Sequence, residues 1–116
     1  MTIKRLLPEE RLSGASICNN IVYLAGQVAD DTTLDAEGQT KDILKQIDAL
    51  LAEAGTSKSN LLSVQIFLAD IADMAAMNRA WDAWLDTANM PARATVEAKL
   101  ADPAWKVEIT GIAAIR

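Results

Sequence analysis

Histidine is absent from this 116-residue sequence, and cysteine occurs once, as Cys18. Without histidine the chain has no histidine-based catalytic triad, no histidine general base and none of the ordinary zinc sites that use imidazole ligands. A single cysteine has no partner for an intrachain disulfide, which is typical of proteins in a reducing compartment. We expect Cys18 to act as a small apolar residue in or near a strand.

Long apolar runs and concentrated positive charge are missing as well. No stretch approaches the roughly 18 to 20 apolar residues of a membrane span. A secretory signal has an apolar segment near its start, and residues 1–10 contain none before their first acidic residues. We therefore expect a cytoplasmic protein with no membrane partner. The formal net charge is −5, and the 11 lysines and arginines are scattered. Nucleic-acid binding needs a concentrated basic face, so we expect no nucleic-acid partner.

The residues that are present predict one folded domain over residues 1–116. With 51% hydrophobic and 23% charged residues, the composition is that of a globular protein. Apolar residues spaced three and four apart predict a helix from about residue 40 to the C-cap Gly55, and a second helix over 74–85 with Asp73 as its N-cap. Strands are predicted at residues 3–7, 12–18, 21–25, 61–69, 93–99 and 105–115. This order favours an α+β domain of ferredoxin-like character, with both helices on one face of a mixed sheet.

The C-terminal stretch, residues 91–116, carries the clearest alternation. Charged or polar residues alternate with small apolar ones over 93–99, which predicts a strand with one polar face. Residues 101–104 interrupt the pattern, so we expect a hairpin with the strand at 105–115. If Glu97 pairs with Glu108, then Arg93, Thr95 and Glu108 share one face, whereas a slip of one residue would put Glu108 on the other. An arginine and a carboxylate on one face can bind an acidic ligand and handle a proton.

The sheet face that the two helices leave uncovered is expected to carry Phe67 together with these polar side chains. A broad, partly apolar face in so small a domain usually finds a partner. The pattern therefore predicts an oligomer, without giving its number of subunits.

Three stretches resemble one family. They are P-A-R-A-T-V-E at 91–97, K-V-E-I at 106–109 and V-Y-L-A-G-Q at 22–27, in family order and spacing. They are similar to the signature of the RidA/YjgF family of enamine/imine deaminases. The resemblance implies a chorismate-mutase-like fold and a homotrimer with sheet faces packed inward and clefts between subunits. It implies hydrolytic deamination of amino-acid-derived enamines or imines to 2-keto acids and ammonia, with no metal and no cofactor.

The resemblance also assigns roles to two residues. Arg93 matches the arginine that binds the substrate carboxylate, and a guanidinium can hold a carboxylate through two parallel hydrogen bonds. The alternative is a structural ion pair of Arg93 with Glu97 or Glu108. Glu108 matches the glutamate that positions or activates the attacking water, and its alternative is an exposed or ion-paired strand residue. We interpret Glu97, in the same motif, as structural.

The resemblance also points to further candidate substrate-binding residues. Gly26 would let a ligand approach the backbone, and Ala25 stands where members often carry a hydroxyl residue. Thr95 stands where some members carry cysteine. The pocket tyrosine of a G-P-Y-type stretch is missing, and Arg11 or Ser13 is a candidate to take its place. Trp105 is a candidate wall of the cleft, although packing in a loop is an equal alternative. These departures indicate a divergent subgroup.

Two other functions stay open at this level. A non-catalytic trimer that binds a small acid such as a keto acid would keep Arg93 and have no use for Glu108 as a base. A structural or regulatory oligomer would need neither residue. Some family members are labelled ribonucleases or translation inhibitors, and the acidic composition argues against carrying that label over.

Overall fold

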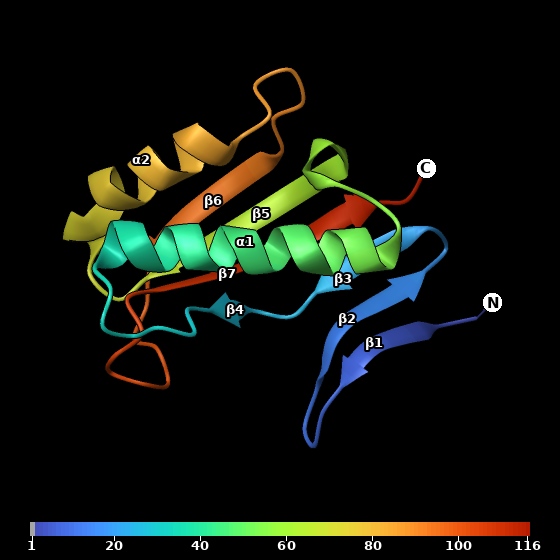
Figure 1. Cartoon of the computed structure of the whole chain (residues 1–116), viewed down its shortest axis with the longest axis horizontal. Coiled ribbons are helices and arrows are strands. Elements are labelled where there is room, and N and C mark those ends of the chain that lie inside the picture. The colour runs from blue at the N-terminus through green and yellow to red at the C-terminus, as the bar shows by residue number, and fades with distance from the viewer. Residues whose placement is uncertain (1) are drawn as a thin grey trace.

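Residues 2–116, which the computed structural model describes, form a seven-stranded sheet with two α-helices on one side of it (Figure 1). The strands are β1 (Lys4–Pro8), β2 (Ser13–Cys18), β3 (Ile21–Leu24), β4 (Gln27–Val28), β5 (Leu61–Leu68), β6 (Ala92–Glu97) and β7 (Val107–Ala114). The helices are α1 (Ala36–Ala54) and α2 (Met74–Trp84), with short 3-10 turns η1 (Lys58–Asn60) and η2 (Ile71–Asp73). This confirms the predicted α+β fold with both helices on one face of a mixed sheet.

The strand order is β1-β2-β3-β7-β5-β6, and β4 pairs with β7. β5 and β6 are parallel, and the other pairs are antiparallel. The predicted hairpin of the last two strands is therefore wrong, because β5 lies between them. A strand, a helix and a strand in succession form a crossover that places the two strands side by side and parallel. β5, α2 and β6 follow this rule, and β7 then pairs with the free edge of β5.

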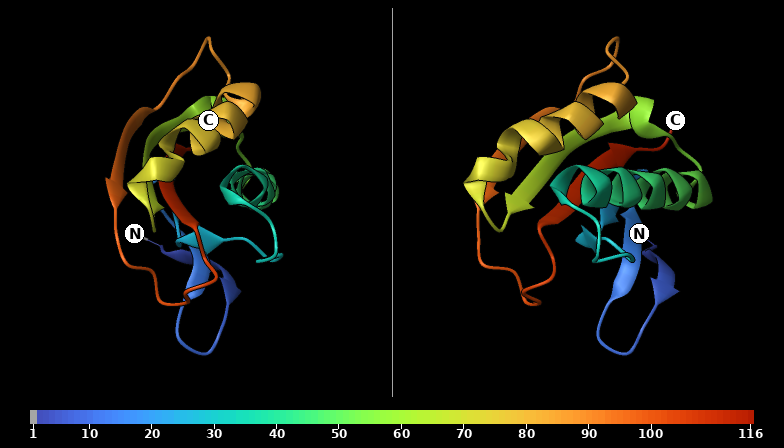
Figure 2. Two further views of the ribbon diagram at one scale, coloured as in Figure 1. Left: turned by 90° about the vertical axis from the view of Figure 1, so that its left-hand side faces the viewer. Right: turned by 60° about the vertical axis from the view of Figure 1, so that its left-hand side comes forward.

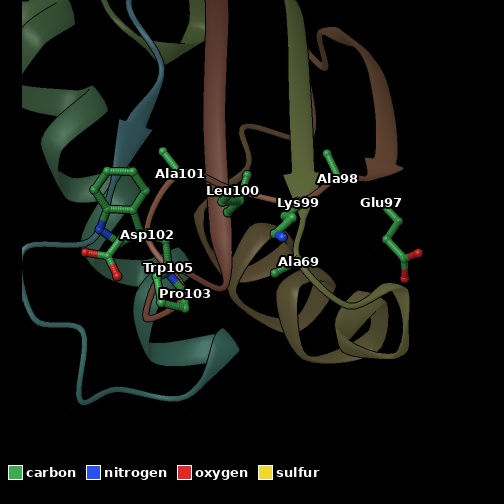
Figure 3. Close-up of a pocket in the computed structure, with 9 residues that line it drawn as sticks. All are labelled: Ala69, Glu97, Ala98, Lys99, Leu100, Ala101, Asp102, Pro103 and Trp105. Carbon is green, nitrogen blue, oxygen red and sulfur yellow. The ribbon is translucent and has the colours of Figure 1, made fainter.

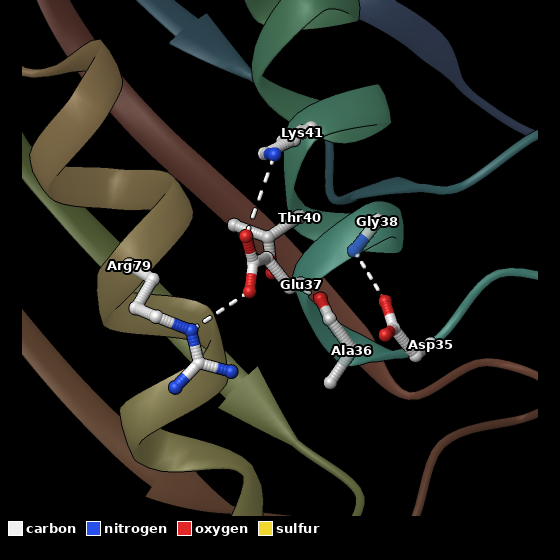
Figure 4. A network of polar contacts seen from close by, with 7 residues as sticks. All are labelled: Asp35, Ala36, Glu37, Gly38, Thr40, Lys41 and Arg79. Atoms are coloured by element: carbon white, nitrogen blue, oxygen red, sulfur yellow. Dashed lines mark hydrogen bonds and ion pairs between the residues drawn. The ribbon is translucent and has the colours of Figure 1, made fainter.

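Helix α1 begins earlier than its apolar pattern suggested. The Asp35 side chain accepts a hydrogen bond from the Gly38 amide at 2.8 Å and caps the helix, so the helix starts at Ala36 and not near residue 40 (Figure 4). Gly55 ends it in the left-handed conformation, at φ 89°, as predicted. The predicted apolar stripe is buried in full; its members are Ile43, Leu44, Ile47, Leu50 and Leu51.

Polar contacts join the first turn of α1 to α2. The Arg79 Nε donates to Glu37 at 2.8 Å, and the Lys41 ammonium lies 3.4 Å from the same carboxylate (Figure 4). The hydrogen bond from Arg79, followed by that from Lys41, lowers the pKa of Glu37. Met77 and Trp81 of α2 are buried in the hydrophobic core.

The two faces of the sheet differ in what covers them. Val107, Ile109 and Ala113 of β7 are buried on the helix side, and Glu108, Thr110 and Ile112 alternate with them on the other side. Figure 2 shows α1 and α2 on the same side of the sheet. We call the side without helices the open face, and Phe67 lies on it opposite Glu108. No helix among residues 2–116 has the length and apolar character needed to cross a membrane.

Candidate functional site

Arg93 lies on edge strand β6 and points to the helix side. It is level with the buried Val64 of β5. Its Nη1 donates to the Asn78 Oδ1 of α2 at 2.9 Å, and its Cζ lies 5.3 Å from the centre of a Trp81 ring. A guanidinium stacked on an aromatic face is held without losing its charge. Two contacts with α2 therefore orient Arg93 while its side chain stays exposed.

No carboxylate neutralises this arginine within the part of the chain that the structure describes. Ion pairs within 4.0 Å are made there by Glu37 alone. Glu97 instead accepts a hydrogen bond from the Ile71 amide at 3.0 Å, at the start of η2, which confirms its structural interpretation. The alternative of a structural pair between Arg93 and Glu97 or Glu108 is thus wrong. Arg93 retains a positive charge that an acidic ligand can use.

Thr95 follows Arg93 on the same face of β6, level with the buried Ile66. Its Oγ1 is buried and has no hydrogen-bond partner among residues 2–116. Buried hydroxyl groups nearly always find a partner, because an unmade hydrogen bond costs about 1 to 3 kcal/mol. Thr95 therefore has an unused donor and acceptor next to the guanidinium.

Glu108 lies on the open face of β7, half-buried between Val28 of β4 and Phe67 of β5. Its carboxylate packs against Gly26, because a Cβ on that glycine would lie 2.2 Å from the Glu108 Oε2. No side chain other than hydrogen fits this spacing unless the carboxylate moves. The missing side chain of Gly26 thus leaves the space that the Glu108 carboxylate occupies.

A groove of about 570 Å³ begins at the same glycine. Its lining includes Ala25 and Gly26, Gln46 and Leu50 of α1, and Trp105. Trp105 also borders a second hollow of about 640 Å³, formed by residues 97–103 and Ala69 and drawn in Figure 3. The Trp105 side chain therefore borders both hollows.

Arg11 does not line the groove. It is exposed in the connection between β1 and β2, and its near neighbours Glu9 and Leu12 are the lining residues there. This connection projects beyond α1 in Figure 1. Arg11 thus lies near the groove without contributing to its surface.

The predicted residues therefore gather in two places and not on one face. Arg93 is level with Val64, and Val64 with Gly111, which is three residues from Glu108 along β7. Two strand spacings of about 4.8 Å and three residues of about 3.4 Å place the Cα atoms of Arg93 and Glu108 roughly 14 Å apart. Their side chains also point to opposite faces. The expected shared face is wrong because it depended on the hairpin that β5 interrupts.

Known proteins share both the sequence and this architecture. The model of a family described as Endoribonuclease L-PSP matches residues 2–115. A RutC family protein of Haemophilus influenzae is 59% identical over 114 residues, which cover 97% of this chain and 98% of that protein. The RutC family protein YoaB of Escherichia coli is 48% identical over 115 residues, covering 99% and 100%. The crystal structure of a YjgF family member from Neisseria meningitidis, 43% identical, matches with a TM-score of 0.97 over 100% of this chain and 97% of that one.

The chain belongs to the RidA/YjgF family.

Two residues that contact Arg93 in this RidA/YjgF protein were not predicted as site residues. Asn78 and Trp81 lie three positions apart on α2 and both contact Arg93. Residues at this spacing share a helix face, but the sequence alone does not tell which strand α2 covers. The parallel pairing of β5 and β6 brings that face over Arg93.

Proposed function

We propose that this RidA/YjgF protein hydrolyses enamine or imine derivatives of amino acids to 2-keto acids and ammonia without a cofactor. The observation that carries the proposal is the Arg93 guanidinium, held by Asn78 and Trp81 and unpaired with any acid among residues 2–116. Such a group is ready to bind the carboxylate of a 2-imino acid. The family resemblance assigns the same role to this position.

Glu108 is the proposed base. Its carboxylate accepts a proton from water while the water oxygen forms a bond to the imine carbon, giving a carbinolamine. The carboxyl group returns that proton to the imine nitrogen, which completes the neutral carbinolamine. The carboxylate then takes the hydroxyl proton of the carbinolamine and passes it to the amino nitrogen, so the C=O bond forms as the C–N bond breaks and ammonia leaves with the 2-keto acid. One imine and one water thus give one keto acid and one ammonia. General-base assistance of this kind typically contributes about 10²- to 10⁴-fold.

The proposed active site needs a second copy of the chain. The Cα atoms of Arg93 and Glu108 lie roughly 14 Å apart along the sheet and their side chains point to opposite faces, so one small imino acid cannot contact both residues of a single chain. The open face carries exposed apolar side chains, including Tyr23 and Val96, which are 49% and 48% exposed. Faces of this kind often form interfaces. We propose that Arg93 and Thr95 of one subunit meet Glu108 and Gly26 of another in a homotrimer.

The test uses imines made in place by an amino-acid oxidase, because free imines hydrolyse quickly in water. Ammonia and keto-acid release are followed with and without the protein over a panel of amino acids. Arg79→Ala serves as the control, since it removes an equal charge from α2 outside the site. Release that exceeds the uncatalysed rate and is retained in the control supports the proposal. Release equal to the protein-free rate for every amino acid contradicts it.

A non-catalytic binder of keto acids gives a different pattern in the same experiments. It binds a keto acid through Arg93 but adds nothing to the rate of imine hydrolysis. The two functions are therefore separated by turnover and not by affinity.

A further inference from the structure

Gln39 is a polar residue with no exposed surface, in the first turns of α1. Its amide makes three hydrogen bonds to main-chain groups. The Nε2 donates to the Leu34 carbonyl and to the Ala104 carbonyl, each at 3.1 Å, and the Oε1 accepts from the Lys106 amide at 2.9 Å. All the hydrogens and the oxygen of this amide thus have partners, so Gln39 is rigidly held in its site.

The two distant partners of Gln39 are the residues immediately before and after Trp105. One buried amide therefore links α1 to both sides of the tryptophan that separates the two hollows. Trp105 is also held by a turn, in which its amide donates to the Asp102 carbonyl at 3.1 Å and the Ala104 amide donates to the Asp102 side chain at 2.8 Å. Lys106 is also tied to the sheet, because its carbonyl accepts from the Ala69 amide at 3.0 Å. Gln39 is thus the link between the helix layer and the Trp105 loop.

We propose that Gln39 is a positioning residue that holds the Trp105 indole between the two hollows and thereby sets which substrate side chains the groove at Gly26 accepts. The part that concerns substrates depends on the proposed function. The part that concerns Trp105 depends on the geometry alone. Trp105 lines the groove together with Gly26, which in turn contacts Glu108, so a displaced indole changes the space beside the proposed base.

Glutamine suits this position because both ends of its amide are used. A glutamate would keep an acceptor for the Lys106 amide but would place a second oxygen against the carbonyls of Leu34 and Ala104. A methionine of similar length would satisfy none of the three groups. Both substitutions should release the Ala104–Trp105 segment while leaving the α1 stripe in place.

Fluorine NMR of protein labelled with 5-fluorotryptophan tests the position of the indole directly. The chain has three tryptophans, and Trp105→Phe assigns the Trp105 resonance. In Gln39→Met and in Gln39→Glu, we expect the Trp105 resonance to shift or broaden and those of Trp81 and Trp84 to stay.

Thr40→Val is the matched control. Thr40 is the neighbouring residue, is equally buried, and donates only within the helix, to the Ala36 carbonyl (Figure 4). The Thr40→Val substitution removes a buried hydrogen bond from the same turn of α1 and should leave all three tryptophan resonances in place. An unchanged Trp105 resonance in both Gln39 variants, or the same change in Thr40→Val, overturns the proposal.

Kinetics test the substrate part. The ratio of kcat/KM for a leucine-derived imine to that for an alanine-derived imine should fall about 10- to 100-fold in Gln39→Met, mainly through KM, because only the larger side chain reaches the indole. An unchanged ratio overturns the specificity role. If the parent protein turns over no imine, the proposed function fails, and fluorine NMR still decides whether Gln39 positions Trp105.

Discussion

Replacing Arg93 with alanine tests the proposed carboxylate site most directly. The guanidinium uses Nη1 on Asn78 and one face on Trp81, which leaves its other nitrogens free for a carboxylate. Charge-assisted hydrogen bonds contribute about 1.5 to 3 kcal/mol, and 1.4 kcal/mol is a factor of ten in affinity. Arg93→Ala should therefore weaken binding of a small keto acid about 10- to 150-fold and abolish deamination.

The fold should survive this change. Removing the stack on Trp81 and the hydrogen bond to Asn78 should cost about 1 to 2 kcal/mol of unfolding free energy, or a few degrees in melting temperature. Arg93→Lys should restore little binding, because an ammonium cannot donate two parallel hydrogen bonds from a planar fork.

The assay is isothermal titration with 2-oxobutanoate, alongside circular dichroism to confirm folding. Arg79→Ala, with the same loss of charge on the same side of the protein, should bind as the parent does. If Arg93→Ala is folded and binds 2-oxobutanoate with the parent affinity, Arg93 is not the carboxylate site.

Four other outcomes are expected. Glu108→Gln should bind keto acids as the parent does but lose about 10²- to 10⁴-fold in turnover; single-turnover rates equal to the parent's would reject Glu108 as the base. Gly26→Ala should displace the Glu108 carboxylate, since the new Cβ would lie 2.2 Å from Oε2. Turnover should then fall with little change in melting temperature, and unchanged turnover would argue against a functional contact between Gly26 and Glu108. Light scattering at micromolar concentration should give a trimer, and a monomer would contradict the shared site. Glu37→Gln should lower the melting temperature at pH 7 but not at low pH. The pKa of Glu37 lies below the usual 4.5, so the stability that its carboxylate contributes is present above pH 4.5 and is lost as pH falls through the lowered pKa. A difference in melting temperature that persists in acid would contradict this.

Local patterns predicted the elements well and the neighbours of each strand less well. The α1 stripe and Gly55 depend on residues within a few positions of one another, so their spacing sufficed. The start of α1 was placed too late because the cap at Asp35 precedes the apolar stripe that marked the helix. The predicted C-terminal hairpin is wrong because consecutive strands need not pair, and β5, from much earlier in the chain, lies between β6 and β7.

Motifs and periodicity are properties of nearby positions, so the family, the fold class and the identity of the candidate residues can be predicted from the sequence. How those residues are grouped depends on the tertiary structure. Whether Arg93 and Glu108 share a face depends on which strands pair, and insertion of β5 between β6 and β7 places the two residues on opposite faces. Contacts such as Gln39 with the Trp105 loop join residues 65 and 67 positions apart. Chain folding creates such contacts, and no local spacing encodes them.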